Sequence, residues 1–260
     1  VLWDVVFETS LAKADLETMT RKGKLYDIRF AAPDGTPLVI STTRPELIPA
    51  CVALFANPGD GRYAHLAGTR AKVPLFDYDV PILASEDVEA GFGTGLMMCC
   101  TFGDGEDVKK WKQHNLDTRT LVQPNGKLGH LAGPYAGLSL EEARKRIVAD
   151  LAAADLIAGE KAVEQNVSVG ERSGTPVEFV MAPQWFINVL DHKPRLLARA
   201  QELQWYPEWM KVRLEQWIDG LKYNWNISRQ RFYGVPFPVW YVQETGEVIL
   251  ADDAMLPVDP

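Results

Sequence analysis

Cysteine and histidine are scarce in this sequence, with three cysteines and four histidines among 260 residues. Three cysteines cannot build a disulfide framework or a four-cysteine zinc site, and the histidines lack the spacing of metal ligands. Cys99 and Cys100 are neighbours in a predicted strand, so their side chains point to opposite faces and at most one enters a pocket. We predict neither a Cys–His nucleophile pair nor a metal site, and we expect a reducing, cytoplasmic environment.

Long apolar runs are also missing. No stretch of about 18 apolar residues occurs, so we expect no membrane-spanning helix. Asp4 and Glu8 stand where a secretory signal would carry a basic start, and no such signal is expected. The formal charge of −8 argues against indiscriminate binding to nucleic-acid phosphates, which depends on Lys and Arg. The range 207–231 is locally basic, with five positive and three negative side chains, although a mixed-charge range can equally be a solvated face.

The composition is that of a globular chain with a sizeable core, 47% hydrophobic and 24% charged. Six of the eight tryptophans follow residue 184, which divides the sequence into two parts. Many short strands and turns in the first part predict a barrel-like, β-rich domain over residues 1–165 with surrounding helices. Helices and short strands are expected over residues 166–260, so the predicted fold class is α/β.

Hydrophobic patterning and capping signals locate the individual elements. Lys24–Ala31 and Pro37–Thr42 form a predicted hairpin around the turn at residues 33–36. The other predicted strands are Ala50–Ala56, Lys72–Leu75, Val80–Leu83, Leu96–Thr101 and the closing hairpin Val239–Val242 with Glu247–Leu250. The predicted helices are Gly105–His114, a helix opened by the capping box at Ser139 and ending near Leu156, Pro194–Leu203 and Pro207–Leu221.

Three consecutive hydroxyls, a guanidinium and a carboxylate follow one predicted strand. They form the segment Ser41-Thr42-Thr43-Arg44-Pro45-Glu46. Hydroxyls at a strand end can hydrogen-bond a ribose or an ester carbonyl, and arginine can hold a phosphate or orient a carboxylate. The residues alone equally allow a simple Ser/Thr-rich turn, followed by a helix that begins at the proline.

A second segment combines glycines, a strand and a cluster of acids. It runs from Gly91-Phe92-Gly93-Thr94-Gly95 through Met98 to Asp104-Gly105-Glu106-Asp107. Glycines let a backbone approach a ligand closely, but the P-loop ending and the dinucleotide spacing are both absent. The acids also lack calcium-loop spacing. As an alternative, Asp104 is a helix N-cap, and Glu106 and Asp107 complement the helix dipole.

Taken together, these segments resemble the class I aminoacyl-tRNA synthetases of the valine, isoleucine and leucine group, especially the valine branch and its inserted editing domain. The resemblance rests on the two segments above and on three later ones in the same order. Those are Gln184-Trp185-Phe186, Trp205-Tyr206-Pro207-Glu208 and the range 227–240, which begins Ile227-Ser228-Arg229-Gln230. It implies an editing domain over residues 1–165 and a junction returning to the catalytic domain over 166–260.

Several features of the family are absent or changed. The signatures for adenylate formation, His-x-Gly-His and Lys-Met-Ser-Lys-Ser, do not occur in these 260 residues. We therefore do not expect this chain alone to activate an amino acid, and we expect ATP to serve only the full-length enzyme. Relatives often carry Cys-x-x-Cys where this chain has Gly170-Glu171-Arg172-Ser173, and Trp-Cys where it has Trp225-Asn226.

The resemblance implies hydrolysis of mischarged threonyl-tRNA(Val). Asp107 would hold the substrate ammonium and Asp104 would meet the threonine hydroxyl. Thr42 and Thr43 would line the pocket, Arg44 would face the terminal nucleotide and Glu46 would support that loop. The other expected substrate-binding residues are Gly93, Thr94, Gly95 and Met98.

With no histidine or cysteine base in these segments, the substrate's own ribose hydroxyl is left to activate water. Editing would need no metal or other cofactor. The expected partner is the aminoacylated 3′ end of tRNA, and we expect a monomer without membrane association. Two alternatives stay open: a non-catalytic, tRNA-binding synthetase paralogue, and the editing domain of an isoleucyl- or leucyl-type enzyme.

Overall fold

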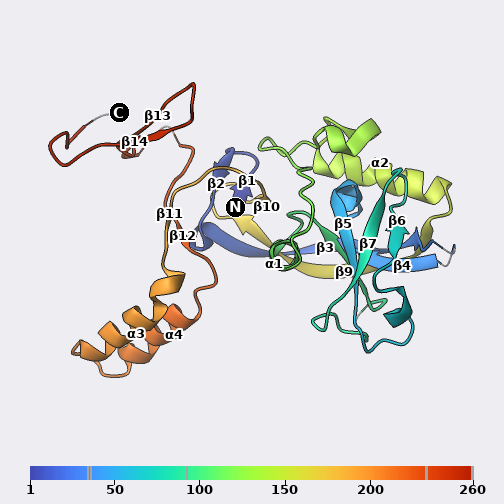
Figure 1. The fold of residues 1–260 in the computed structure, drawn as a ribbon, viewed down its shortest axis with the longest axis horizontal. Coiled ribbons are helices and arrows are strands. Elements are labelled where there is room, and N and C mark those ends of the chain that lie inside the picture. The colour runs from blue at the N-terminus through green and yellow to red at the C-terminus, as the bar shows by residue number, and fades with distance from the viewer. Residues whose placement is uncertain (34, 36, 92, 232–233, 259–260) are drawn as a thin grey trace. The chain divides into compact units, whose positions relative to one another are not determined.

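The computed structural model describes residues 1–33, 35, 37–91, 93–231 and 234–258. The chain has two compact units, Val1–Arg229 and Gln230–Pro260, which are described separately (Figure 1). Some residues of the predicted turn and motifs lie outside the described ranges. These are Asp34, Thr36, Phe92, Phe232 and Tyr233.

The main sheet of the first unit has seven strands in the order β4-β3-β6-β7-β5-β8, with β9 also paired to β3. Its strands are β3 (Leu16–Ala31), β4 (Pro37–Thr42), β5 (Cys51–Ala56), β6 (Arg70–Lys72), β7 (Asp79–Ala84), β8 (Leu96–Cys100) and β9 (Ile157–Gly170). In the described part of this sheet β5 and β7 pair in parallel, and the other ladders are antiparallel. The predicted α/β class is confirmed at this level.

The predicted barrel does not close. β4 and β8 approach each other, but no backbone ladder joins them among the described residues. Pro45, which has no N–H to give to a ladder, starts the 3₁₀-helix η2 (Pro45–Ala50) three residues after the last residue of β4. The chain turns there into β5, and no strand ladder continues between β4 and β8 among the described residues.

The core lies between this sheet and helix α2 (Leu140–Ala153). Ala143, Ile147 and Leu151 recur at helical spacing on one face of α2 and are fully buried. They join a cluster of strand side chains that includes Ile28 and Leu54. Ser139 and Glu142 form the predicted capping box, which fixes the start of this helix.

A long ribbon and a small sheet complete the β structure of the first unit. β3 and β9 pair over most of their length, from Leu16 opposite Gly170 to Ile28 opposite Ile157. The small sheet has the order β10-β1-β2, formed by β1 (Leu2–Asp4), β2 (Thr9–Ser10) and β10 (Glu178–Phe179). It therefore unites the beginning of the chain with residues that follow the ribbon.

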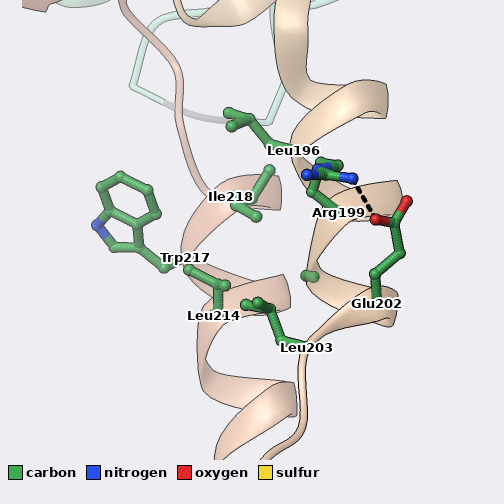
Figure 2. Close-up of a pocket in the computed structure, with 8 residues that line it drawn as sticks. Leu196, Arg199, Glu202, Leu203, Leu214, Trp217 and Ile218 are labelled. Atoms are coloured by element: carbon green, nitrogen blue, oxygen red, sulfur yellow. Dashed lines mark hydrogen bonds and ion pairs between the residues drawn. The ribbon is translucent and has the colours of Figure 1, made fainter.

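Helices α3 (Lys193–Glu202) and α4 (Met210–Asp219) form a hairpin beside the two-stranded sheet of β11 (Phe186–Ile187) and β12 (Trp225–Asn226). A pocket of about 360 Å³ lies between the helices. Its apolar lining is Leu196, Ala200, Leu203, Leu214, Trp217 and Ile218. Figure 2 shows the Arg199–Glu202 ion pair at its side. No described helix is both long and apolar enough to span a membrane.

Most predicted elements are present within one to three residues. The second unit is a hairpin of β13 (Val239–Tyr241) and β14 (Val248–Leu250), as predicted. The strand predicted at Lys72–Leu75 is wrong, because Val73 and Pro74 already belong to a turn and the strand is Arg70–Lys72. The predicted domain boundary at residue 165 falls inside β9. The remaining elements are α1 (Gly105–Gln113), η1 (Lys13–Asp15), η3 (Ala64–Leu66), η4 (His130–Tyr135) and η5 (Leu190–His192).

Candidate active site

One groove of about 2370 Å³ in the first unit gathers most of the predicted site residues. Two segments about 60 residues apart in sequence meet there, at the ends of β4 and β8. The predicted residues that line it are Thr42, Thr43, Arg44, Gly93, Thr94, Met98, Asp104 and Asp107. Glu46 and Gly95 do not line it, and both are buried.

The hydroxyls at the end of β4 have different surroundings. Ser41 donates a hydrogen bond to Asp27, at 2.5 Å, and Thr42 Oγ1 accepts one from the backbone N–H of Arg44, at 3.0 Å. Thr43 is half-buried and lines the groove. The Thr42 contact makes a tight turn that directs the following arginine inward. The chain therefore presents threonine side chains and a guanidinium together at one strand end.

Asp104 and Asp107 stand at the start of α1 in different environments. Asp104 is exposed, and its carboxylate accepts a hydrogen bond from the backbone N–H of Asp107 at 2.9 Å, which makes it the helix N-cap. Asp107 is 7% exposed and packs over the backbone of Gly103, where any side chain would collide with its Oδ2. The glycine thus provides the space in which the buried carboxylate lies.

Burial gives Asp107 an unusual affinity for a proton. Removal from water, followed by the nearby charge of Asp104, raises the pKa of the Asp107 carboxyl to about 8, although Arg44 opposes the shift. A positively charged ligand beside Asp107 would favour its ionised form. The groove therefore contains a carboxyl whose charge is best stabilised by a bound cation.

Arg44 is the centre of a charged cluster at the wall of the groove. Its Nε donates to Glu46 at 3.1 Å and its Nη2 donates to Glu178 at 2.7 Å, while Nη1 reaches the carbonyl of Gly103 at 3.3 Å. Arg144 donates to both oxygens of Glu46, at 2.8 and 2.6 Å. Two guanidinium groups and two carboxylates thus neutralise one another, and 27% of the Arg44 side chain is exposed.

The two acids of this cluster shift in opposite directions. Burial by itself would raise the pKa of the fully buried Glu46, but hydrogen bonds from Arg144 and the charge of Arg44 hold it below its usual value. Burial raises the pKa of Glu178, and Arg44 only partly opposes this. Glu46 is therefore the firmly ionised member of the cluster.

The glycine-rich segment leaves one hydroxyl available. Thr94 Oγ1 is buried in the wall of the groove and has no hydrogen-bond partner among the described residues. Gly93 and Gly95 flank it with positive φ of 58° and 82°, a conformation that glycine adopts without strain. A buried hydroxyl without a partner is costly, so this atom is suited to meet a polar ligand atom.

Cysteine contributes one thiol to the lining of this groove. Cys100 lines it, whereas Cys99 points to a separate core cluster, as expected for neighbours in a strand. Burial raises the pKa of both thiols, so both are neutral. None of the described lining residues is histidine, and the described residues contain no group of three or more His, Cys, Asp or Glu placed to hold a metal ion.

Sequence reasoning missed two residues of the charged cluster, Arg144 and Glu178. Glu178 had a local signal, since it is a single acid in the apolar stretch 177–180. Arg144 had none that separated it from the other basic residues of α2. Their partners are 98 and 134 residues away in sequence, so only the fold brings the four charges together.

The two departures from the family pattern have local structural consequences. The turn at residues 171–174 after β9 is closed by Ser173, whose Oγ accepts from the backbone N–H of Thr175 at 3.2 Å. Asn226 is buried and its Oδ1 accepts from the backbone N–H of Ser228 at 3.2 Å. Its Nδ2 has no partner among the residues described.

Comparison with known proteins places this chain in a family. The family model described as "tRNA synthetases class I (I, L, M and V)" matches residues 1–259. The chain therefore belongs to the class I tRNA synthetases.

Curated relatives match the chain over its whole length. The Valine--tRNA ligase of Rickettsia rickettsii (strain Sheila Smith) is 47% identical over 264 residues, covering 100% of this chain and 32% of the relative. Those of Orientia tsutsugamushi (strain Boryong) and Anaplasma marginale (strain St. Maries) are 46% and 45% identical, each with 100% of this chain and 33% of the relative covered. The chain spans about a third of the length of these relatives.

A solved structure of an Agrobacterium radiobacter K84 LeuRS, described as a ternary complex with tRNA and LeuAMS, is also similar. It is 18% identical, has a TM-score of 0.42, and covers 92% of this chain and 25% of that chain.

Proposed function

We propose that this chain carries the editing site of a valine--tRNA ligase and hydrolyses threonyl-tRNA(Val). The observation that carries the proposal is the meeting of the threonine-rich and glycine-aspartate segments along one groove, linked by the hydrogen bond from Arg44 to Gly103. The relatives are named as valine--tRNA ligases, which points to threonine as the amino acid that is attached in error. A hydrophobic site for valine cannot strongly reject threonine, because the two side chains have nearly the same shape; this pair is a well-known example of weak discrimination. A second, hydrolytic site removes the error.

The substrate is held by its cation. The α-ammonium of the mischarged amino acid pairs with Asp107 through a charge-assisted hydrogen bond. The raised pKa of this carboxyl supports the assignment, since a buried acid gains most from an incoming cation. Thr42 and Thr43 lie around the amino acid and the terminal ribose, and the exposed part of Arg44 faces the terminal nucleotide. Glu46 supports the loop from behind.

Discrimination depends on the threonine hydroxyl. The exposed carboxylate of Asp104 accepts a hydrogen bond from it, and the unpartnered hydroxyl of Thr94 provides a further polar contact. Valine leaves the buried Thr94 hydroxyl unpaired, a penalty of about 1 to 3 kcal/mol. Gly93 and Met98 shape the wall, and Gly95 lies next to the Thr94 that lines it.

Water attacks the ester carbonyl. Because the described lining residues include no histidine and Cys100 is a neutral thiol, the substrate's own ribose hydroxyl activates the water. The groove contributes mainly position, which alone lowers such barriers substantially. Editing on this account uses no metal or other cofactor, and ATP serves only the full-length enzyme.

Residues 166–260 serve as the junction to the rest of the synthetase. Twelve large apolar side chains of the first unit are exposed between Met181 and Ile227, against four in the preceding described residues. Exposed apolar surface of this extent marks an interface. We assign it to contacts with the part of the longer relatives that this chain does not span. tRNA is the partner of the groove, and the protein acts as a monomer.

A panel of mischarged tRNAs tests this function on the intact protein. Hydrolysis of threonyl-tRNA(Val) well above that of valyl-tRNA(Val) is expected. Preference for another amino acid would assign the groove to an isoleucyl- or leucyl-type enzyme. No hydrolysis of any ester, with tRNA still bound, would contradict the editing function and favour a non-catalytic paralogue.

A further inference from the structure

Glu178 is a buried acid that the proposed reaction does not use. It lies in β10 with 5% of its surface exposed, and its Oε2 is 2.7 Å from Nη2 of Arg44. β10 pairs with β1 and belongs to the small sheet, whereas Arg44 follows β4 of the main sheet. The ion pair therefore connects the main sheet to the small sheet, and Glu178 itself lines the groove.

Arg44 divides its guanidinium among three segments of the chain. Besides Glu178, it bonds Glu46 in η2 and the carbonyl of Gly103, which lies directly before Asp104 and under Asp107. A guanidinium is planar and rigid, so fixing the direction of Nη2 also fixes the direction of Nη1. The position of Glu178 therefore bears on the position of the loop that carries both aspartates.

Glu46 does not fix Arg44 by itself. Both of its oxygens also accept from Arg144, at 2.8 and 2.6 Å, so it is shared between two guanidinium groups. Glu178 is the second carboxylate of the cluster, and among the described residues its ion pair is with Arg44. Without its charge, Arg44 would be held by a shared acid and one carbonyl.

We propose that Glu178 is a positioning residue for the hydrolytic groove: it orients Arg44 and, through the Gly103 carbonyl, holds the loop with Asp104 and Asp107 in register with the threonine segment. This inference rests on the proposed editing function. Glu178 acts through Arg44 rather than on the substrate.

Glu178→Gln, which keeps the size of the side chain and removes its charge, tests the proposal on the intact protein with threonyl-tRNA(Val). We expect kcat to fall about tenfold and KM to change less than about twofold, because loss of position affects the reaction more than tRNA binding. In Arg44→Lys the single ammonium group cannot donate to Glu178 and Gly103 with the fixed geometry of a guanidinium, so kcat should fall by a similar factor. The double variant should be no slower than the slower single one, because both break the same connection.

Glu141→Gln is the matched control, since Glu141 is an exposed acid paired with Lys145 on α2. It should keep the wild-type kcat. Amide hydrogen exchange over residues 101–108 gives a readout that does not depend on hydrolysis, and it should rise in Glu178→Gln but not in Glu141→Gln. If Glu178→Gln fails to fold, Glu178→Asp, which keeps the charge but shortens its reach to Arg44, carries the same two measurements.

The outcomes separate this proposal from the editing function. If the wild type hydrolyses the ester and Glu178→Gln keeps the wild-type kcat, the positioning role is overturned. It is also overturned if the losses of kcat in Glu178→Gln and Arg44→Lys multiply in the double variant. If the wild type hydrolyses no ester, the editing function fails and exchange decides alone. Faster exchange over residues 101–108 in Glu178→Gln then supports the positioning role of Glu178, and unchanged exchange overturns it.

Discussion

The carboxylate of Asp104 accepts a hydrogen bond from the backbone N–H of Asp107 at 2.9 Å, so one candidate residue fixes the helix turn that presents the other. Asp104 is exposed and Asp107 is buried, although they are three residues apart at the start of α1. Their contributions to stability and to catalysis can therefore be separated by substitution.

Asp104→Ala should affect both stability and selectivity. Loss of the N-cap lowers the free energy of unfolding by about 1 kcal/mol. Loss of the acceptor for the threonine hydroxyl lowers the ratio of threonyl to valyl ester hydrolysis. Asp104→Asn keeps an acceptor and should retain the stability and most of the ratio. Urea unfolding and paired deacylation assays check this, and an unchanged ratio in Asp104→Ala would leave Asp104 as a helix cap alone.

The raised pKa of Asp107 predicts a pH dependence of stability. The folded protein holds this proton until about pH 8, whereas the unfolded chain releases it near pH 4. The folded state binds more protons in between, so Asp107 makes the free energy of unfolding fall as pH rises through this range. Asp107→Asn should lack that contribution, so its free energy of unfolding should rise relative to that of the wild type as the pH increases toward 8. Urea titrations at several pH values measure it; parallel curves for the two proteins would refute the burial argument.

Glu46→Ala should be among the most destabilising substitutions in the first unit. It leaves Arg44 and Arg144, whose side chains are 27% and 38% exposed, without the buried carboxylate between them, at a cost of about 1.5 to 3 kcal/mol. Glu141→Ala, which removes an exposed acid from the same neighbourhood, should change the free energy of unfolding by less than about 1 kcal/mol. Equal losses in the two variants would show that the Glu46 cluster does not stabilise the fold.

Gly103→Ala should disturb the groove more than the fold. The added methyl group would collide with Asp107 Oδ2 and contact Leu47, so the buried carboxylate must move. We expect deacylation to fall at least about tenfold through misplacement of Asp107. Gly61→Ala is the control, because a methyl group there meets no atom within 4 Å. Wild-type rates in Gly103→Ala would mean that the position of Asp107 is not critical.

Local signals predicted the helices that frame the site. Asp104 before α1 and the capping box at Ser139 before α2 identify the starts of both helices, because capping depends on residues only three positions apart. Proline at residue 45 likewise indicated the end of the hydroxyl-rich strand. Such features can be read from one sequence because the interacting groups are close along the chain.

Long-range pairing could not be read in the same way. The β3–β9 ribbon joins Leu16 to Gly170, and much of β3 before Lys24 is exposed and polar, so it lacks the apolar alternation that marks a strand. The contact between Arg44 and Glu178 spans 134 residues. The threonine and aspartate segments could be selected from the sequence, but the acid that orients their arginine required the fold.

The central claim is that Asp107 grips the ammonium group of a mischarged amino acid. Initial rates of hydrolysis of threonyl-tRNA(Val) by the intact wild type and by Asp107→Asn, at equal concentration and with folding verified by circular dichroism, test it most directly. We expect rapid hydrolysis by the wild type and a loss of about a hundredfold in the variant, the order expected when a charged contact is removed. Equal rates for the two proteins would contradict it.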